Sequence, residues 1–434
     1  MWPRGKVPPW RRGFPFYLAE PRSAIERLRA FGSKRVWTEG PMWKRLTLGG
    51  TMAVSWPVVA LKDAVAISAK RAQEGRSPFL SSFRTLWRAA LTRNVPPNVG
   101  ALYEWALGLR STEMADVLLP LDLRALQRLS LIRGALLQDV QDKGRFEQIC
   151  RSRGLRCVQT IATFDRGASE GEGSLRKRRE PLFVKALTGN RGVGAQLWRP
   201  GGRGFVSSGG QDLTIDELIE SLQRQNCIVQ PALEDHRVLK DIGTVALSNV
   251  RIVTCKGRTI SSTAIAASIS LAVEPGSLTG HEGVHCGIDV SDGTIATTLS
   301  AIDEDDRLTN RNLIGLALPH WNDCLSLVCK AHDEAFSAFA TLGWDVALTS
   351  TGAVLLEANV HWGMFGHQRL TGPLGKTVLA DVIDELIAPV QDVPRSADRS
   401  LKPDARSLLP VPRADLGPAA AKGRKRQRRA TTAS

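Results

Sequence analysis

The sequence has no pair of cysteines at a spacing that binds metal or performs redox exchange. Its seven cysteines are odd in number, and no two of them form a C-x-x-C pair. Cys324 and Cys329 are five positions apart, which places them about 140° apart around a helix and keeps them from sharing a metal ion on one face. These features argue against a disulfide scaffold or a zinc module, and they favour buried, reduced thiols in a cytoplasmic protein.

The sequence also lacks an uninterrupted apolar run of the length that a membrane-spanning helix needs. The longest apolar stretch, Leu46–Leu61, is interrupted by Ser55 and Pro57 and is followed by Lys62-Asp63. It holds about 16 residues, whereas a spanning helix needs roughly 20. The first residues are rich in proline and arginine and do not resemble a secretory signal. We therefore expect neither a signal peptide nor a spanning helix, whereas a peripheral contact with acidic lipid stays open.

Outside its two ends, the sequence has almost no net charge. The whole chain carries 58 Lys and Arg against 43 Asp and Glu, a net charge of +15. Residues 1–45 hold eleven basic and three acidic residues, Lys422–Arg429 holds six basic residues, and the rest holds 41 basic and 40 acidic residues. Because the excess is confined to the ends and no reader module is recognisable, we expect no specific nucleic acid partner. The ends permit weak electrostatic contact with anionic membranes or other polyanions.

Composition divides the chain into four regions. Residues 1–40 form a basic, Pro- and Arg-rich segment, and residues 41–140 show a helical apolar pattern with a break at Pro96-Pro97. Residues 141–389 are expected to form a domain, in which strands and helices alternate from about residue 181. Residues 390–434 are expected to be a disordered basic tail. The apolar residues expected to anchor the helical region are Trp43, Leu46, Trp56, Leu61, Trp87, Leu91, Trp105 and Leu107.

The first chemically informative motif follows a predicted strand that ends at Lys185. Three glycines stand in the next loop, Gly189, Gly192 and Gly194. Glycines allow a backbone to approach phosphates closely with its N–H groups turned inward, and the lysine adds a fixed positive charge. No G-K-[S/T] follows as in a Walker loop, and the lysine precedes the glycines, unlike in a Rossmann fingerprint. The pattern indicates a phosphate-binding loop, with a plain glycine-turn hairpin as the alternative.

The second motif is a predicted hairpin that brings oxygen ligands together. Two strands flank a three-residue loop that ends at Gly352. With the turn centred on Thr351, Asp345 pairs with Glu357, and Asn359 points to the same face. This set suits a hard cation such as Mg²⁺. The alternative is an ordinary polar face, but the rest of the predicted face is Ala347, Thr349 and Leu355, and two facing acids would repel each other without a cation.

Together these motifs resemble the ATP-grasp superfamily, and most closely its sugar-transfer-associated branch, which is related to alpha-L-glutamate ligases. The resemblance covers roughly residues 45–385, and its metal-binding end is its most specific part. It extends less specifically to Trp56-Pro57 and Asn94–Trp105. The matching blocks are Asp142-Lys143 with Phe146, Phe183–Lys185 with Gly192 and Gly194, Cys227–His236, Val250-Arg251, Gly315–Trp321, Gly343–Asp345 and Leu356–Asn359.

The resemblance implies an α+β protein with the ATP-grasp fold, in which two lobes, each a small antiparallel sheet with helices, clasp ATP. A helical N-terminal region and disordered basic tails complete the expected architecture. The implied activity is an ATP-dependent carboxylate–amine ligase that works through an acyl phosphate, in cell-surface polysaccharide or sugar-conjugate synthesis. The implied cofactors are ATP and Mg²⁺, with Mn²⁺ as a substitute. The implied partners are ATP, a carboxylate and an amine, with a sugar among the candidate substrates.

The resemblance also assigns roles to individual residues of this chain. Arg251 and Lys185 are the implied catalytic residues, with Arg251 facing the transferring phosphoryl group. The implied metal ligands are Asp345, Glu357 and Asn359. The implied ATP-binding residues are Lys143, Lys185, Gly189, Gly192, Gly194, Gln230, Leu233 and His236.

Several positions depart from the family pattern. Gln230 stands where many relatives carry a hinge carboxylate, and the acid that grips ribose is left to Asp235 or Asp241. Val360–Gly363 replaces the common Pro-Gly after the metal-binding Asn. Two alternatives therefore remain: an ATP-grasp protein that binds nucleotide without ligating anything, and a nucleic-acid-binding protein that uses its basic tails. The sequence does not decide the substrates, the oligomeric state or substrate contact by His285, His361 and His367.

Overall fold

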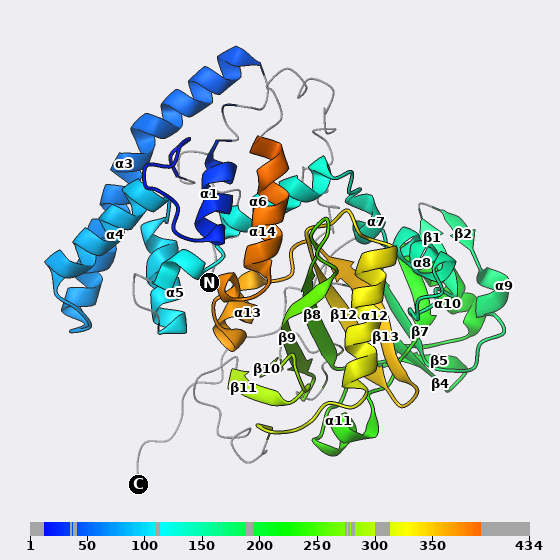
Figure 1. Ribbon diagram of the computed structural model, residues 1–434. Coiled ribbons are helices and arrows are strands. Elements are labelled where there is room, and N and C mark those ends of the chain that lie inside the picture. Colours follow the sequence, from blue (N-terminus) through cyan, green and yellow to red (C-terminus); the bar gives the residue numbers. More distant parts are fainter. Residues whose placement is uncertain are drawn as a thin grey trace, which may run out of the picture. The chain divides into compact units, whose positions relative to one another are not determined.

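Two antiparallel sheets occupy the middle of the chain in the computed structural model (Figure 1). The mixture of helices with these sheets confirms the predicted α+β class. Gly189, Gly192 and the C-terminal tail lie outside the described residues, so the expectations made for them stay predictions. The structure describes residues 13–34, 37, 41–108, 113–165, 167–187, 194–273, 276, 278, 283–299 and 313–391.

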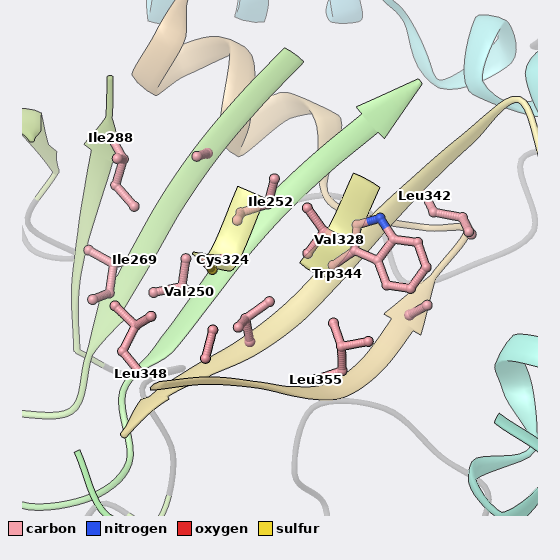
Figure 2. Packing of buried hydrophobic residues seen from close by; sticks show 14 of the residues in the cluster. Val250, Ile252, Ile269, Ile288, Cys324, Val328, Leu342, Trp344, Leu348 and Leu355 are labelled. Carbon is pink, nitrogen blue, oxygen red and sulfur yellow. The ribbon is translucent and has the colours of Figure 1, made fainter. Parts of the chain in front are cut away.

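The six-stranded sheet has the strand order β11-β10-β9-β8-β12-β13. One of its faces packs against helix α12 (Trp321–Glu334), with Val328 and Trp344 in the shared core, as Figure 2 shows. Strand β12 is buried along all nine of its residues because it lies between β8 and β13 and is covered on both faces. The strands are β8 (Asn249–Cys255), β9 (Thr263–Leu271), β10 (Val284–Ile288), β11 (Ile295–Leu299), β12 (Thr341–Thr349) and β13 (Gly352–Asn359).

The opposite face of this sheet packs against helices from both ends of the described chain. Leu28 of α1 and Ile383 of α14 share a core with Val253 of β8. A buried ion pair joins α1 to α6, because Arg29 Nη2 donates to Asp122 Oδ2 at 2.7 Å. The helices in this part are α1 (Ala24–Ser33), α6 (Pro120–Ile132), α13 (Met364–Thr371), the 3₁₀ helix η4 (Leu374–Lys376) and α14 (Leu379–Gln391).

The seven-stranded sheet has the strand order β2-β1-β7-β3-β4-β5-β6. Helix α10 (Ile215–Gln223) supplies Leu218, Ile219 and Leu222 to its core. This helix begins with a capping box in which Thr214 and Glu217 each bond the other's backbone N–H. The strands are β1 (Ala162–Asp165), β2 (Ala168–Glu170), β3 (Leu182–Ala186), β4 (Gln196–Gly201), β5 (Gly204–Ser207), β6 (Asp212–Leu213) and β7 (Cys227–Pro231).

Short helices connect these parts. The segment before the first strand contains α8, which begins at Lys143, and the side chain of the N-cap residue Asp142 accepts a hydrogen bond from the Arg145 N–H. The connecting helices are η2 (Glu113–Asp116), α7 (Gln138–Gln141), α8 (Lys143–Ser152), α9 (Glu172–Leu175) and α11 (Arg237–Asp241).

The helical N-terminal region is confirmed, but two expectations about it are wrong. The first is that the apolar stretch is too short for a membrane-spanning helix, since helix α3 runs unbroken from Met42 to Gln73 and passes through Pro57. By length and composition it is the one helix among the described residues that is apolar enough to cross a membrane. The predicted break at Pro96-Pro97 is present, between α4 (Phe79–Arg93) and α5 (Pro97–Leu107).

The second error concerns the apolar anchors of this region. Trp56 is buried and packs with Trp87 and Leu91 of α4, as expected. Trp43, Leu46 and Leu61 are exposed instead, and none of them belongs to the core that Trp56 forms with α4. The side chain of Trp105 lies outside the described part of the structure.

Candidate functional site

A cavity of about 430 Å³ is lined by residues from both sheets. Most of the residues that the sequence singled out for ATP and metal binding take part in its lining. They come from α8, from β3, from β7 and the segment after it, and from the β12–β13 hairpin, four parts of the chain that are separate in the sequence. The predicted site residues that line the cavity are Lys143, Lys185, Gln230, Leu233, Asp345 and Glu357.

The β12–β13 hairpin places Asp345 opposite Glu357, as predicted, but for a different reason. The turn is one residue shorter than expected, since Thr349 pairs with Gly352 and only two residues lie between the strands. This register alone would not pair Asp345 with Glu357. A β-bulge between Asp345 and Val346 shifts the register by one residue and restores the pairing.

The bulge also corrects the predicted composition of this face. Leu355 was expected beside Glu357, yet it is fully buried in the core on the other side of the sheet. Leu356 is the extra residue of the bulge, and it lines the cavity together with Glu357. Next to the acids, the face therefore presents Leu356 and Ala347.

Arg251 lies beside these acids because β8 pairs with β12 in antiparallel register, with Arg251 opposite Asp345. Its Nε donates to Asp345 Oδ1 and its Nη2 to Asp345 Oδ2, both at 2.6 Å. Burial lowers the pKa of the Arg251 guanidinium, but the neighbouring Asp345 carboxylate outweighs this and holds that pKa above its ordinary value. The planar fork of arginine suits this two-point contact.

The two lysines approach the acids from different elements. Lys185 on β3 loses hydration in the site, and this lowers its pKa to about 8, against the opposing effect of the Glu357 carboxylate. Burial likewise lowers the pKa of Lys143 in the first turn of α8, again against the effect of Glu357. Glu357 is thus the shared counter-charge of both lysines.

Another part of the cavity is less charged. Gln230 on β7 is buried, and its Nε2 donates to Thr160 Oγ1 at 3.4 Å. Leu233 packs with Val158 and Leu356, which also line the cavity. This apolar lining, with an amide beside it, suits a flat heteroaromatic ring better than a phosphate.

His236 does not line the cavity. Its Nδ1 accepts a hydrogen bond from the Val238 N–H at 3.2 Å and so caps α11. The carboxylate just before it, Asp235, does line the cavity, but Ser248 already donates to both of its oxygens. Of the three predicted glycines only Gly194 is described, with a φ of 77° that favours glycine.

Two basic residues of the cavity were missed by the sequence reasoning. Arg199 on β4 and Lys240 on α11 both belong to its lining. Neither stands in a motif, so no local signal marks them. The histidines left open by the sequence do not line it: Ser270 Oγ contacts His285 Nδ1 at 2.8 Å, Gln127 Nε2 contacts His361 Nδ1 at 3.1 Å, and His367 is buried against Trp362.

The acid cluster suits a divalent cation of the hard class. The cluster consists of Asp345, Glu357 and Asn359 and offers two carboxylates and one amide oxygen. Asn359 stands beside Glu357, because its Nδ2 donates to Glu357 Oε1 at 3.1 Å. The described residues contain no group of three His, Cys, Asp or Glu side chains that would hold a metal by themselves. The donor set is thus all oxygen and includes Asn359, which matches Mg²⁺ rather than zinc.

Comparisons with solved structures find distant similarity to a ligase and a synthetase. D-alanine-D-alanine ligase from Helicobacter pylori is 12% identical over 59% of this chain and 62% of its own, with a TM-score of 0.34. N5-carboxyaminoimidazole synthetase from Staphylococcus aureus is 11% identical over 58% of each chain, with a TM-score of 0.31. The chain thus spans less than two thirds of the length of either protein. No curated protein matches the sequence.

A scan of protein families gives a direct match to the sequence. The model of the sugar-transfer associated ATP-grasp family matches residues 129–376. This range contains every residue that the sequence singled out for ATP or metal binding, from Lys143 to Asn359. Because the match covers more than half of the chain, the protein belongs to the sugar-transfer associated ATP-grasp family.

Proposed function

We propose that the protein is an ATP-dependent ligase that joins a carboxylate to an amine through an acyl phosphate. The observation that carries the proposal is the single cavity in which Lys143, Lys185, Asp345 and Glu357 meet. The two lysines can neutralise the charge of a polyanion, and the two carboxylates can bind the cation that accompanies it. The family assignment supports the use of ATP, and we propose that the reaction takes place in the cytoplasm.

The charges suggest how ATP would lie. The apolar part around Leu233 and Gln230 would receive the adenine. Lys143 and Lys185 would then neutralise the α- and β-phosphates, because both line the cavity and both feel the charge of Glu357. Arg251 stands beside Asp345, where it would stabilise charge that develops on the transferring phosphoryl group.

Asp345, Glu357 and Asn359 would hold Mg²⁺, or Mn²⁺ in its place. Such an ion, when bound, draws charge from the β- and γ-phosphate oxygens. The protein's own contribution is to fix the two carboxylates by pairing Asp345 with Arg251 and Glu357 with Asn359. Both acids are therefore held in place before ATP arrives.

In the proposed reaction a substrate carboxylate oxygen attacks the γ-phosphorus of ATP. The bond from the γ-phosphorus to the bridging oxygen breaks, and ADP leaves with that electron pair. The amine then attacks the carbonyl carbon of the acyl phosphate, inorganic phosphate leaves, and the amine proton passes to solvent. No covalent bond to the protein is needed. The family's association with sugar transfer supports a sugar-bearing substrate, in polysaccharide or sugar-conjugate synthesis.

One observation favours a second candidate, a nucleotide-binding protein without ligase activity. Both oxygens of Asp345 already accept hydrogen bonds from Arg251, which leaves this acid less available to a cation. A ligase has to accommodate the cation beside this ion pair, whereas a simple nucleotide-binding protein does not.

The deciding experiment measures ADP and phosphate release with Mg²⁺ and ATP, alone and with panels of sugar acids, amino acids and amines. The ligase proposal expects phosphate release that depends on a carboxylate, and hydroxylamine should trap the acyl phosphate as a hydroxamate. ATP binding in calorimetry with no turnover under any carboxylate would instead support the second candidate. The Glu357→Gln variant, assayed alongside, shows whether any turnover arises in this cavity.

A further inference from the structure

Helix α3 carries a row of exposed, large apolar side chains that the nucleotide site does not explain. They are between 42% and 74% exposed, whereas large apolar side chains in contiguous groups are usually covered. None of them lines the cavity described above. The six residues, called the apolar stripe below, are Trp43, Leu46, Val54, Val58, Leu61 and Val65.

The spacing of the stripe follows one side of the helix. Steps of three, four or eight residues separate its members, and at about 100° per residue these steps return to nearly the same side. From Trp43 to Val65 the stripe extends about 33 Å at about 1.5 Å per residue. Thr47, Gly50 and Thr51 are exposed between Leu46 and Val54, whereas from Val54 to Val65 an apolar residue recurs every three or four positions. This regular spacing is more than a scatter of single exposed residues.

The side of α3 next to the stripe is held by the protein itself. Ala60 and Ala64 are fully buried, and Trp56 Nε1 donates to the Ala90 carbonyl oxygen of α4 at 3.0 Å. Further along, Arg71 pairs with Glu104 of α5 at 3.2 Å. These contacts fix the rotation of α3 about its axis and leave the stripe exposed.

Charge around the stripe has one dominant sign. Helix α3 holds five basic residues, Lys44, Arg45, Lys62, Lys70 and Arg71, and a single acidic one, Asp63. Lys44 follows Trp43 and Lys62 follows Leu61, so at about 100° per residue both lysines stand at the edge of the stripe. Their long stems can lie along an apolar layer while the ammonium groups reach anionic headgroups.

We propose that α3 lies in the interface of an anionic lipid bilayer, with its apolar stripe in the acyl region and Lys44 and Lys62 at the headgroups. An apolar side bordered by lysines, with a tryptophan at one end, is the pattern of helices that lie in a membrane surface. The eleven basic residues of the first 45 add to the attraction. The proposal is independent of the ligase reaction, since the stripe and the cavity share no residue.

Two other arrangements of α3 are less consistent with its charges and contacts. If α3 spanned the bilayer, Lys62 and Asp63 would enter the membrane, and the contacts of Trp56 and Arg71 with α4 and α5 would have to go with them. If a second copy of the chain covered the stripe, the lysines at its edges would approach like charges. A bilayer with acidic headgroups meets neither difficulty.

Vesicle sedimentation with the full-length chain tests the proposal. The vesicles are phosphatidylcholine alone, or phosphatidylcholine with about one third phosphatidylglycerol. We expect binding to the anionic vesicles, and at least about tenfold weaker binding for the stripe variant Val58→Glu. The matched control is Ala66→Glu, which adds a negative charge at an exposed position of the same helix but outside the stripe. Its affinity for the anionic vesicles should decrease much less. Circular dichroism confirms that each variant is folded.

Four outcomes would overturn the proposal. The first is equal binding by the stripe variant and by Ala66→Glu, which would make the contact purely electrostatic. The second is loss of all vesicle binding on removal of residues 395–434, which would assign the binding to the tail. The third is resistance to extraction by alkaline carbonate, which would indicate a spanning helix. The fourth is a stripe-dependent dimer in ultracentrifugation with no vesicle binding, which would indicate a second copy as the occupant.

Discussion

Arg251 and Asp345 face each other across strands β8 and β12 and form a two-point ion pair, with both N–O distances at 2.6 Å. The Asp345 side chain is almost fully buried, and that of Arg251 is mostly so. The pair sits where the proposed cation and the transferred phosphoryl group would meet. Each partner therefore serves the fold as well as the chemistry, and the predictions for this pair have to separate the two roles.

Replacing Arg251 by Met leaves a buried carboxylate without its main partner. We expect Arg251→Met to lower the free energy of unfolding by about 2 kcal/mol or more, since an unpaired buried charge is costly. The double variant Arg251→Met/Asp345→Asn, which removes the charge, should recover part of this loss. Urea unfolding of the wild type, both single variants and the double variant measures the coupling. Additive losses would mean that the ion pair contributes nothing of its own.

Glu357→Ala is expected to abolish Mg²⁺-dependent ATP turnover while the protein stays folded. The substitution removes one proposed cation ligand and the counter-charge of both lysines. A control is Glu220→Gln, which removes a surface carboxylate that pairs with Arg224 and lies outside the cavity lining. Turnover is measured by phosphate release and folding by circular dichroism. A Glu357→Ala protein with more than about a tenth of wild-type turnover would disprove the metal assignment.

Lys185→Ala should weaken ATP binding, and Lys185→Arg should not restore it fully. A compact ammonium and a planar guanidinium place their charge differently, so the larger group does not fit the same position. Isothermal titration calorimetry with ATP compares the three proteins. If Lys185→Ala binds ATP as the wild type does, β3 and the following glycines form only a hairpin and not a phosphate site.

ATP binding should take up protons above neutral pH, because the pKa of Lys185 is about 8 before the phosphates arrive. Bound phosphates favour the charged ammonium and raise that pKa, so the fraction of neutral lysine at pH 8.5 has to be protonated. Calorimetry in buffers of different ionisation enthalpy measures this uptake, which should disappear in Lys185→Met. A binding enthalpy that is independent of the buffer in the wild type would contradict the prediction.

The same pKa shift has a defined effect on the stability of the protein without ATP. The folded-state pKa of Lys185 lies below its ordinary value of 10.5, so the unfolded chain binds more protons between about pH 8 and 10.5. The contribution of Lys185 is therefore least favourable below pH 8, and it improves as the pH rises through this window. Unfolding of wild type and Lys185→Met at both ends of the window shows whether their difference narrows.

Deleting residues 395–434 should leave ATP binding and carboxylate-stimulated phosphate release unchanged. The deletion removes the six basic residues of Lys422–Arg429 but none of the proposed site. Weak, salt-dependent binding of DNA or other polyanions should decrease, since fewer phosphates are neutralised. Both activities are measured at low and high salt. Loss of ATP binding on truncation would show that the tail is part of the active structure.

The hairpin that brings Asp345 and Glu357 close together could be predicted from the sequence because a hairpin is a local structure, whereas their exact pairing depends on the bulge. Eleven residues separate the two acids, and a turn between two apolar runs brings the strands that carry them side by side. The bulge could not be predicted in the same way. Leu355 and Leu356 are both apolar, and only the core packed against β13 decides which of them is buried.

The surroundings of these acids depended on the tertiary structure. Arg251 was predicted to face a phosphoryl group, but its position opposite Asp345 follows from the register between β8 and β12, which are about 90 residues apart in sequence. Arg199 and Lys240 join the cavity only through the arrangement of β4 and α11. No pattern in their own neighbourhood marks them, because the contacts that position them are long-range.

Helix α3 shows the same difference between what the local sequence determines and what contacts between elements determine. The sequence by itself determined that this segment is helical, since hydrogen bonds within the segment and its helix-forming residues outweigh one proline. It did not determine which side is covered, because apolar residues occur all around the helix. Packing of Trp56 and Ala60 against α4 decided that, and it left Trp43, Val54 and Val58 exposed. Local hydrogen bonding fixes an element, whereas the burial of one face and the assembly of a site depend on contacts between elements.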